Sequence, residues 1–229
     1  MSLENNIKRE LESLGAEFVH YVDISHLSAE QNRGYPVAIL LGLPLSLPYV
    51  KNLIDNPDYV KNLFENNQLH LDEFCLKEKK ADQMADHIAA YLSDKGYSAF
   101  SQSEEGIEKS GTYNVAEKRT PLPHKTIAVY AGLGWIGNAN LLITADYGSA
   151  FCMCSVLTDA PLKTVLHKPE ESKCGKCVIC RNICPTQAIK GNSWKVGTAR
   201  EELVDVHNCY CCLKCLAHCP FTKTHIKDM

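Results

Sequence analysis

Cysteines near the C-terminus constrain this chain more than any other feature. The sequence has 12 cysteines in 229 residues, and nine of them lie between positions 174 and 219. Two stretches, "CGKCVICRNICP" and "CYCCLKCLAHCP", carry the same spacing, C-x2-C-x2-C-x3-C-P. A segment of roughly 60 residues buries little apolar surface of its own, so metal centres or cross-links must help to hold this part of the fold together.

The repeated spacing predicts two [4Fe–4S] clusters. It is the bacterial two-cluster ferredoxin run, in which the fourth cysteine of each block binds the cluster of the other block. We therefore expect two ligand sets: Cys174, Cys177, Cys180 and Cys219 for the first cluster, and Cys209, Cys212, Cys215 and Cys184 for the second. One alternative is structural zinc, which normally uses two C-x2-C pairs with a longer spacer. The other is a disulfide framework.

The remaining cysteines have less specific interpretations. Cys211 lies inside the second block, either as a bystander or as a ligand that replaces Cys209 if that thiol points away. Cys152 and Cys154 share one face of an expected strand, where they are small buried thiols or part of a further metal site. Cys75 is interpreted as a core or surface thiol.

Composition and charge restrict the class of protein. The net charge is −3 and no basic stripe is present, which argues against a dedicated nucleic-acid surface. The N-terminus, "MSLENNIKRE", lacks the apolar core of a signal peptide, and the most apolar run, "PVAILLGLPLSLPYV", is broken by glycine and proline. These features predict a cytoplasmic protein without a membrane-spanning segment, whose cysteines hold metal.

Helix and strand patterns alternate through the first two thirds of the chain, which predicts an α/β layer fold. Helices are expected over 3–15 and 70–96, ending at Gly15 and Gly96, with shorter ones over 138–143 and 185–191. Strands are expected over 16–24, 35–45, 97–103, 125–132 and 149–157, and a polar loop over Glu104–Arg119. We expect an α/β domain over 1–168 and a ferredoxin-like domain over 169–229.

The stretch "IAVYAGLGWIGNANLLI", residues 127–143, contains three glycines in the spacing G-x-G-x-x-G. That spacing marks dinucleotide-binding loops when a strand precedes it, a long helix follows, and an acidic residue stands about 20 positions further on. Here the run after the glycines is short, and the nearest acid, Asp146, comes too early. The context therefore disfavours a nicotinamide site.

The segment from "PLPHKTIAVYAGLGWIG" to "SAFCMCSVLTDAPL", followed by the first cysteine block, resembles the epoxyqueuosine reductases and their shorter relatives. The resemblance runs from about Tyr97 to Cys219. It implies a cobalamin-binding α/β lobe joined to a bacterial-type double [4Fe–4S] domain, a fold shared with the reductive dehalogenases.

By this resemblance, the glycine stretch packs against a corrinoid, and glycine would let the backbone approach a flat macrocycle closely. The implied cofactor-binding residues are Pro121, Ala131, Gly132, Gly134, Trp135, Ile136, Gly137 and Asn140. A flavin would need a similar pocket. Trp135 is either an apolar wall of that pocket or a core residue.

Two positions depart from the family pattern. The aspartate that these enzymes carry three residues before the proline of this segment is Lys118 here, and the Glu-Arg pair that usually follows is His124-Lys125. His124 and Lys118 are therefore the candidate proton donors, the lysine only if desolvation lowers its pKa. The alternatives are a solvated loop lysine and a loop or interface histidine.

The resemblance implies an iron–sulfur oxidoreductase. A ferredoxin- or flavodoxin-type donor would pass electrons through two clusters to cobalamin, which reduces a small substrate or is itself the substrate. The alternatives are a ferredoxin-like electron carrier without corrinoid and an epoxyqueuosine reductase acting on tRNA. The chain ends ten residues after Cys219 without the C-terminal helical repeats of the tRNA-acting enzymes, so tRNA is not the expected partner. A homodimer is a further hypothesis.

Overall fold

The computed structural model describes residues 2–227, and the chain folds into two compact units. Unit 1 comprises residues 2–43, 77–132 and 152–168, and unit 2 comprises residues 44–76, 133–151 and 169–227. The last change of unit, between Lys168 and Pro169, falls at the expected domain boundary. The two earlier segments of unit 2 lie inside the expected α/β domain, and no sequence pattern predicts that they group with the cysteine blocks.

Unit 1 is built on a four-stranded sheet with the strand order β1-β2-β6-β3. The strands are β1 (Phe18–Asp23), β2 (Val37–Pro44), β6 (Phe151–Thr158) and β3 (Ala99–Ser101). β1 is antiparallel to β2, with Phe18 opposite Gly42, and β3 is antiparallel to β6, with Ala99 opposite Thr158. These strands lie where the sequence predicts them, although β3 is shorter than expected.

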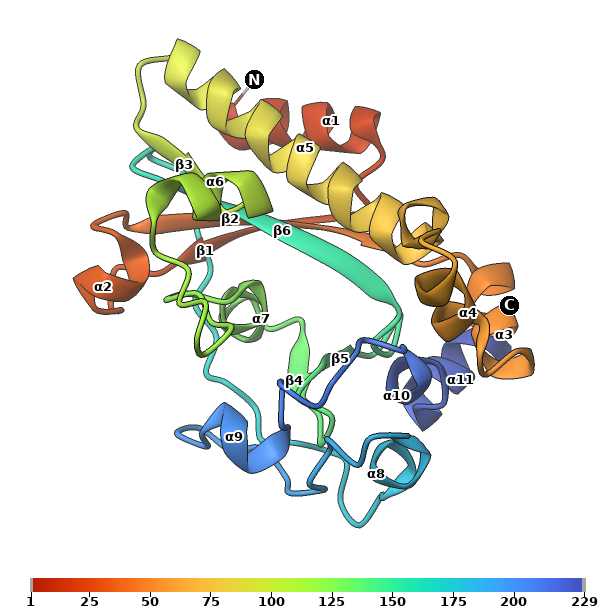
Figure 1. Ribbon diagram of the computed structural model, residues 1–229. Coiled ribbons are helices and arrows are strands. Elements are labelled where there is room, and N and C mark those ends of the chain that lie inside the picture. Colours follow the sequence, from red (N-terminus) through yellow and green to blue (C-terminus); the bar gives the residue numbers. More distant parts are fainter. Residues whose placement is uncertain (1, 228–229) are drawn as a thin grey trace. The chain divides into compact units, whose positions relative to one another are not determined.

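Helices α1 (Leu3–Leu14) and α5 (Glu73–Asp94) cover one face of the sheet (Figure 1). Both were predicted, and α1 ends as expected at Gly15, whose φ of 99° is left-handed. The core on this face combines residues of the two helices with alternate residues of the strands: Ile7, Leu11, Ile88, Leu92, Ile39, Leu41, Cys154 and Val156. Because side chains alternate along a strand, the residue between the last two, Ser155, faces the other side of the sheet.

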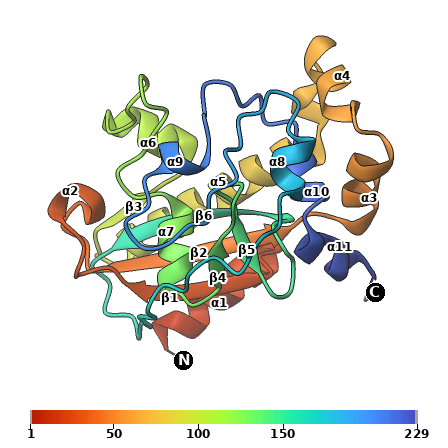
Figure 2. The ribbon, with the colours of Figure 1, turned by 90° about the horizontal axis from the view of Figure 1, so that it is seen from below.

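The opposite face of the sheet carries α7 (His124–Tyr130), which lies in front of the strands in Figure 2. The sequence prediction of a strand over 125–132 is therefore wrong. The run "TIAVY" is apolar and rich in β-branched residues, and a run this short does not distinguish a buried strand from a buried helix. Pro123 precedes the helix, and its fixed φ is compatible with a helix start.

A second error concerns the polar segment after β3. Its first half is α6 (Glu104–Ser110), and only the second half, through Arg119, is a loop. The Ser103 hydroxyl accepts a hydrogen bond from the Gly106 amide at 3.1 Å and donates one to Asp86 at 2.7 Å. The serine followed by two glutamates is a helix-start signal that the prediction missed. One further short helix of unit 1 was also not predicted, α2 (Ala29–Asn32).

Unit 2 contains short helices and one hairpin. The elements are α3 (Leu47–Asp55), α4 (Tyr59–Glu65), η1 (Leu69–Leu71), β4 (Gly134–Ile136), β5 (Leu142–Thr144), α8 (Ile179–Ile183), α9 (Arg200–Leu203), α10 (Lys214–Ala217) and α11 (Pro220–Lys227). The helices expected over 138–143 and 185–191 are wrong: the first segment forms the hairpin turn and β5, and in the second Ile189 pairs with Val204 as a β-bridge. Within residues 2–227, no helix is long and apolar enough to cross a membrane.

Candidate iron–sulfur sites and the glycine stretch

The first predicted ligand set comes together in unit 2. A cavity of about 210 Å³ is lined by Cys174, Cys177 and Cys180 from the first block and by Cys219 from the second. Cys215 also contributes to its wall. The volume is far larger than the roughly 10–15 Å³ that admits one water molecule, so the cavity has room for a polynuclear group. The exchange of the fourth cysteine between blocks, which the spacing predicts, matches this arrangement.

The protonation of these thiols depends on what compensates their charge. Burial raises the pKa of Cys180 to about 11, and the neighbouring thiols of the first set act in the same direction. Burial also raises the pKa of Cys219, against hydrogen bonds from the backbone amides of Thr222 and Phe221. A bound metal removes the thiol protons outright, so a cationic iron centre suits this donor set.

The second predicted set adjoins the first through Cys215. Burial raises the pKa of Cys215 to about 12, and the thiols of Cys212, Cys209 and Cys180 act in the same direction. Tyr210 lies close to Cys212 and Cys184, which add to the increase that burial causes in its pKa. Helices α8 and α10 of the two blocks pack against each other. The fourth member of the set therefore shares the neighbourhood of the other three.

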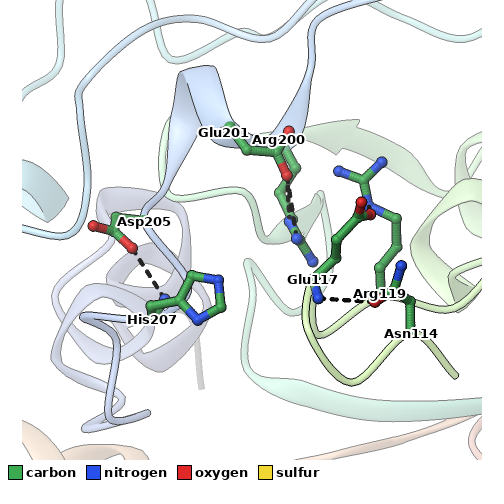
Figure 3. Close-up of polar contacts among 7 residues, drawn as sticks. All are labelled: Asn114, Glu117, Arg119, Arg200, Glu201, Asp205 and His207. Atoms are coloured by element: carbon green, nitrogen blue, oxygen red, sulfur yellow. Dashed lines mark hydrogen bonds and ion pairs between the residues drawn. The ribbon is translucent and has the colours of Figure 1, made fainter.

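Local hydrogen bonds lower the pKa of Cys184 and form a turn before the second cysteine block. Partial burial acts to raise the pKa of Cys184, but the Thr186 hydroxyl at 3.6 Å and backbone amides of residues 186, 188 and 189 together lower it. The Asp205 carboxylate accepts a hydrogen bond from the His207 amide at 3.0 Å (Figure 3) and one from the Asn208 amide at 3.3 Å. This turn directly precedes Cys209, the first cysteine of the second block.

Asn138 joins the glycine stretch to the first cysteine block. This buried side chain lines the cavity and donates a hydrogen bond to the Cys177 carbonyl at 3.2 Å. Its oxygen accepts hydrogen bonds from the hydroxyls of Ser172 and Ser193, at 3.4 and 3.2 Å. The sequence prediction missed this residue. The only available signal was a pair of asparagines, Asn138 and Asn140, between the glycines and an apolar run.

Replacing Asn138 with alanine should loosen the first cysteine loop. The change leaves the Cys177 carbonyl and two hydroxyls without their partner, which costs about 1–3 kcal/mol for buried groups. We expect iron of the first cluster to transfer to a chelator several-fold faster, with the second cluster unaffected. The exposed Asn182→Ala on α8 is the control and should match the wild-type rate. Equal rates for Asn138→Ala and wild type would contradict this role.

At each of the three glycines of the stretch, a Cβ atom would collide with another residue of the same unit. A Cβ on Gly134 would lie 1.9 Å from the Ile143 carbonyl oxygen, across the β4–β5 hairpin. On Gly137 it would lie 2.5 Å from the Ile143 side chain. Gly132 has a φ of +74°, and its Cβ would meet the His167 ring at 2.8 Å. The stretch follows a helix and leads into a hairpin, which is not the strand–loop–helix context of dinucleotide sites.

Trp135 lies buried in unit 2, which is compatible with its interpretation as a core residue. Its side chain is buried and packs edge-on against Phe221, with 5.0 Å between the ring centroids. The Lys173 ammonium lies 4.9 Å from the centre of the indole ring and forms an ion pair with Glu170 at 2.6 Å. The indole nitrogen is buried without a hydrogen-bond partner among the described residues.

The residues assigned to a corrinoid belong to both units, because the chain passes from unit 1 to unit 2 between Gly132 and Leu133. Those in unit 1 are Pro121, Ala131 and Gly132, and those in unit 2 are Gly134, Trp135, Ile136, Gly137 and Asn140. Ala131 and Ile136 are buried, and Pro121 and Asn140 are half-buried. Asn140 has a left-handed φ of 60° in the turn of the hairpin.

The two candidate proton donors of unit 1 have different environments. Lys118 is exposed, with a φ of 50°, in a turn closed by the Asn114 amide, which donates to the Arg119 carbonyl at 2.8 Å. His124 begins α7, and its Nδ1 lies 2.8 Å from the Ser155 Oγ. Burial lowers the pKa of His124 to about 4, so the ring is neutral at pH 7. A neutral ring does not supply the proton that the acid role of His124 requires.

Comparisons with known proteins agree with the resemblance drawn from the sequence. No family model matches the chain. It is 28% identical over 178 residues to an epoxyqueuosine reductase of Vibrio cholerae, covering 77% of this chain and 43% of that protein. It is 34% identical over 116 residues to the epoxyqueuosine reductase of Pseudomonas aeruginosa, covering 51% and 27%. The chain thus spans less than half the length of these curated relatives.

Solved structures confirm the fold. A crystal structure of epoxyqueuosine reductase matches 96% of this chain and 66% of that one, with a TM-score of 0.55 and 14% identity. A catabolic reductive dehalogenase matches 94% and 31%, with a TM-score of 0.60 and 17% identity. The chain is therefore similar to the epoxyqueuosine reductases and has the α/β fold that they share with reductive dehalogenases.

Two further matched structures concern partners and cofactors of those proteins. One is an epoxyqueuosine reductase with an epoxyqueuosine-modified tRNA stem loop, at a TM-score of 0.55 and 14% identity. The expectation that tRNA is not a partner of this chain gains no support from this match. The other is a reductive dehalogenase described by a B12-dependent mechanism, at a TM-score of 0.56 and 16% identity.

Proposed function

We propose that this protein is an iron–sulfur reductase that carries electrons through two [4Fe–4S] clusters in unit 2. The observation that carries the proposal is the cavity lined by Cys174, Cys177, Cys180 and Cys219, because three thiols of one block and the fourth of the other line one cavity. The neighbourhood of Cys209, Cys212, Cys215 and Cys184 supports the second site. The electron donor proposed is a ferredoxin- or flavodoxin-type protein.

Residues around the first cavity would tune electron transfer. The walls include the apolar side chains of Leu141, Ile143 and Phe221, which limit access of water to the cavity. Lys173, which also lines the cavity, brings a positive charge that favours the more negative, reduced state of a bound cluster. Asn138 fixes the Cys177 carbonyl and so holds the first loop in place.

We further propose that the protein binds cobalamin and reduces a small substrate, or that the corrinoid itself is the substrate. When bound, a corrinoid supplies the cobalt centre that takes up electrons and performs the difficult step. Similarity to epoxyqueuosine reductases and the fold shared with a B12-dependent dehalogenase support this part of the proposal. The chain's contribution would be to bind and orient the corrinoid and to shield it from water.

A ferredoxin-like carrier without corrinoid is the second candidate. The observation that favours it is that Gly132, Gly134 and Gly137 each have a packing reason within the protein. The burial of Trp135 against Phe221 points the same way. None of these residues therefore requires a macrocycle to explain its identity.

An anaerobic absorption titration of the reconstituted, dithionite-reduced protein with hydroxocobalamin separates the two candidates. Saturable binding with a changed corrinoid spectrum is expected for the reductase. A corrinoid spectrum that stays as in free solution would identify a carrier and remove the cobalamin part of the proposal. Incubation with epoxyqueuosine-containing tRNA, followed by mass spectrometry of its nucleosides, tests whether the substrate lies in tRNA.

A further inference from the structure

A series of three linked hydrogen bonds, two of them buried and one partly buried, runs through unit 1 on the face of the sheet that carries α7. The Gln102 amide nitrogen donates to the Leu122 carbonyl at 2.9 Å. The Ser155 hydroxyl donates to the Gln102 amide oxygen at 2.8 Å, and Ser155 Oγ lies 2.8 Å from the Nδ1 of His124. Three segments that are distant in sequence therefore meet in one polar chain: the end of β3, the loop before α7, and the middle of β6.

The order of donors in this chain fixes the proton on His124. Because the Gln102 nitrogen faces a carbonyl, its oxygen must face Ser155. The serine hydroxyl has a single hydrogen, and it is used in the bond to that oxygen. Only lone pairs of Ser155 remain for His124, so the ring must donate through Nδ1–H. In a neutral imidazole the other nitrogen, Nε2, is then a hydrogen-bond acceptor.

Burial makes this arrangement stable. Ser155 is 0% exposed and Gln102 is 4% exposed, so water does not compete for their hydrogen bonds. If the Gln102 amide were flipped, its oxygen would face the Leu122 carbonyl, and two buried hydrogen-bond acceptors would face each other. His124 is half-buried, and its partial removal from water lowers the pKa of the ring to about 4, so the ring is neutral at pH 7.

The Nε2 atom of His124 is available to a ligand. Within residues 2–227, no side chain or backbone group hydrogen-bonds to it. Among the described residues, the side-chain nitrogen and oxygen atoms that are buried without a hydrogen-bond partner belong to Trp135 and His218. The Nε2 of His124 also has no partner but is not among these buried atoms, so it is accessible to solvent. An unprotonated nitrogen accepts a hydrogen bond but cannot offer one to an anion.

We propose that Ser155 and Gln102 are positioning residues that lock His124 with its proton on Nδ1, and that Nε2 accepts a hydrogen bond from a ligand carrying an O–H or N–H group. The site selects neutral donors such as hydroxyls and amides over carboxylate or phosphate oxygens. This assignment requires neither the clusters nor a corrinoid, so it stands independently of the proposed function.

Nitrogen-15 NMR of the full chain, labelled on histidine and kept oxidised under anaerobic conditions, measures which ring nitrogen of His124 carries the proton. At pH 7.5 the His124 ring should show a protonated Nδ1 and an unprotonated Nε2, assigned by loss of the signals in His124→Gln. An Nε2–H tautomer or an imidazolium ring in the wild-type protein would overturn the proposal, whatever the variants do.

Variants on β6 identify what sets the tautomer. Ser155→Ala should give a mixture of both tautomers, and Ser155→Thr, which keeps a hydroxyl, should restore the wild-type spectrum. Thr158→Val removes another buried hydroxyl of β6, which donates to the Ser98 carbonyl at 2.8 Å, and should leave the His124 signals unchanged. An unchanged tautomer in folded Ser155→Ala would contradict the positioning role.

Acylation by diethyl pyrocarbonate tests whether Nε2 is available, because this reagent attacks an unprotonated ring nitrogen. We expect the His124 peptide of the folded protein to be acylated at pH 7.5, as measured by peptide mass spectrometry. If His124 reacts only after unfolding, Nε2 is covered in the folded protein and cannot bind a ligand.

Discussion

Replacing Cys219 with serine is expected to remove one of the two clusters and to leave the other in place. This cysteine belongs to the second block but lines the same cavity as Cys174, Cys177 and Cys180. A cubane cluster needs four thiolates, so we expect iron in the anaerobically reconstituted protein to fall from about eight to about four atoms per chain. Iron and sulfide analysis measures this, and the EPR spectrum of the reduced protein should lose the coupling between two clusters.

Two further substitutions make this result specific. Cys184→Ser should also remove about four iron atoms, but those of the second cluster. Cys211→Ser is the matched control: this exposed cysteine lies beside the second set, and the spacing leaves it out. If Cys211→Ser loses as much iron as Cys209→Ser, the assignment of the second set is wrong. Retention of both clusters in Cys219→Ser would contradict the exchange of ligands between blocks.

Replacing Gly134 with alanine is expected to have the largest effect on folding. The new Cβ would lie 1.9 Å from the Ile143 carbonyl oxygen, which belongs to the backbone of the paired strand β5. Overpacking typically costs about 1–3 kcal/mol, and a backbone atom cannot rotate away as a side chain does. We therefore expect a loss above about 3 kcal/mol, a large part of the stability of a typical domain.

The midpoint of anaerobic urea denaturation, followed by circular dichroism, measures this loss. Gly197→Ala is the control in the same unit, because its Cβ meets nothing within 4 Å although its φ is +91°. Only the left-handed backbone opposes alanine there, at about 1–2 kcal/mol. If Gly134→Ala is no less stable than Gly197→Ala, the close approach across the hairpin does not explain this glycine.

Features with a fixed spacing or a long period were predictable from the sequence. The spacing of the two cysteine blocks predicted that Cys219 lies with Cys174, Cys177 and Cys180, and these four thiols line one cavity together with Cys215. The apolar run of β2 predicted a buried strand, and the amphipathic patterns of α1 and α5 predicted the two helices that cover one face of the sheet. In each case many residues repeat one signal.

Short elements and tertiary contacts were not predictable in this way. The run before the glycines forms α7 because it packs on the sheet, and its apolar residues suit a strand equally well. The glycines follow from approaches to Ile143 and His167, which no local pattern reveals. The roles of Asn138 and Ser155 depend on partners more than 30 residues away along the chain.

Electron transfer from the reduced protein to cobalamin tests whether the clusters serve a corrinoid. The reconstituted protein would be reduced, freed of excess dithionite and mixed anaerobically with cob(II)alamin, while the absorption of both centres is followed. We expect the clusters to reoxidise as the corrinoid is reduced, and Cys219→Ser to transfer electrons much more slowly. Clusters that remain reduced beside an unchanged corrinoid would contradict a role of the clusters in corrinoid reduction.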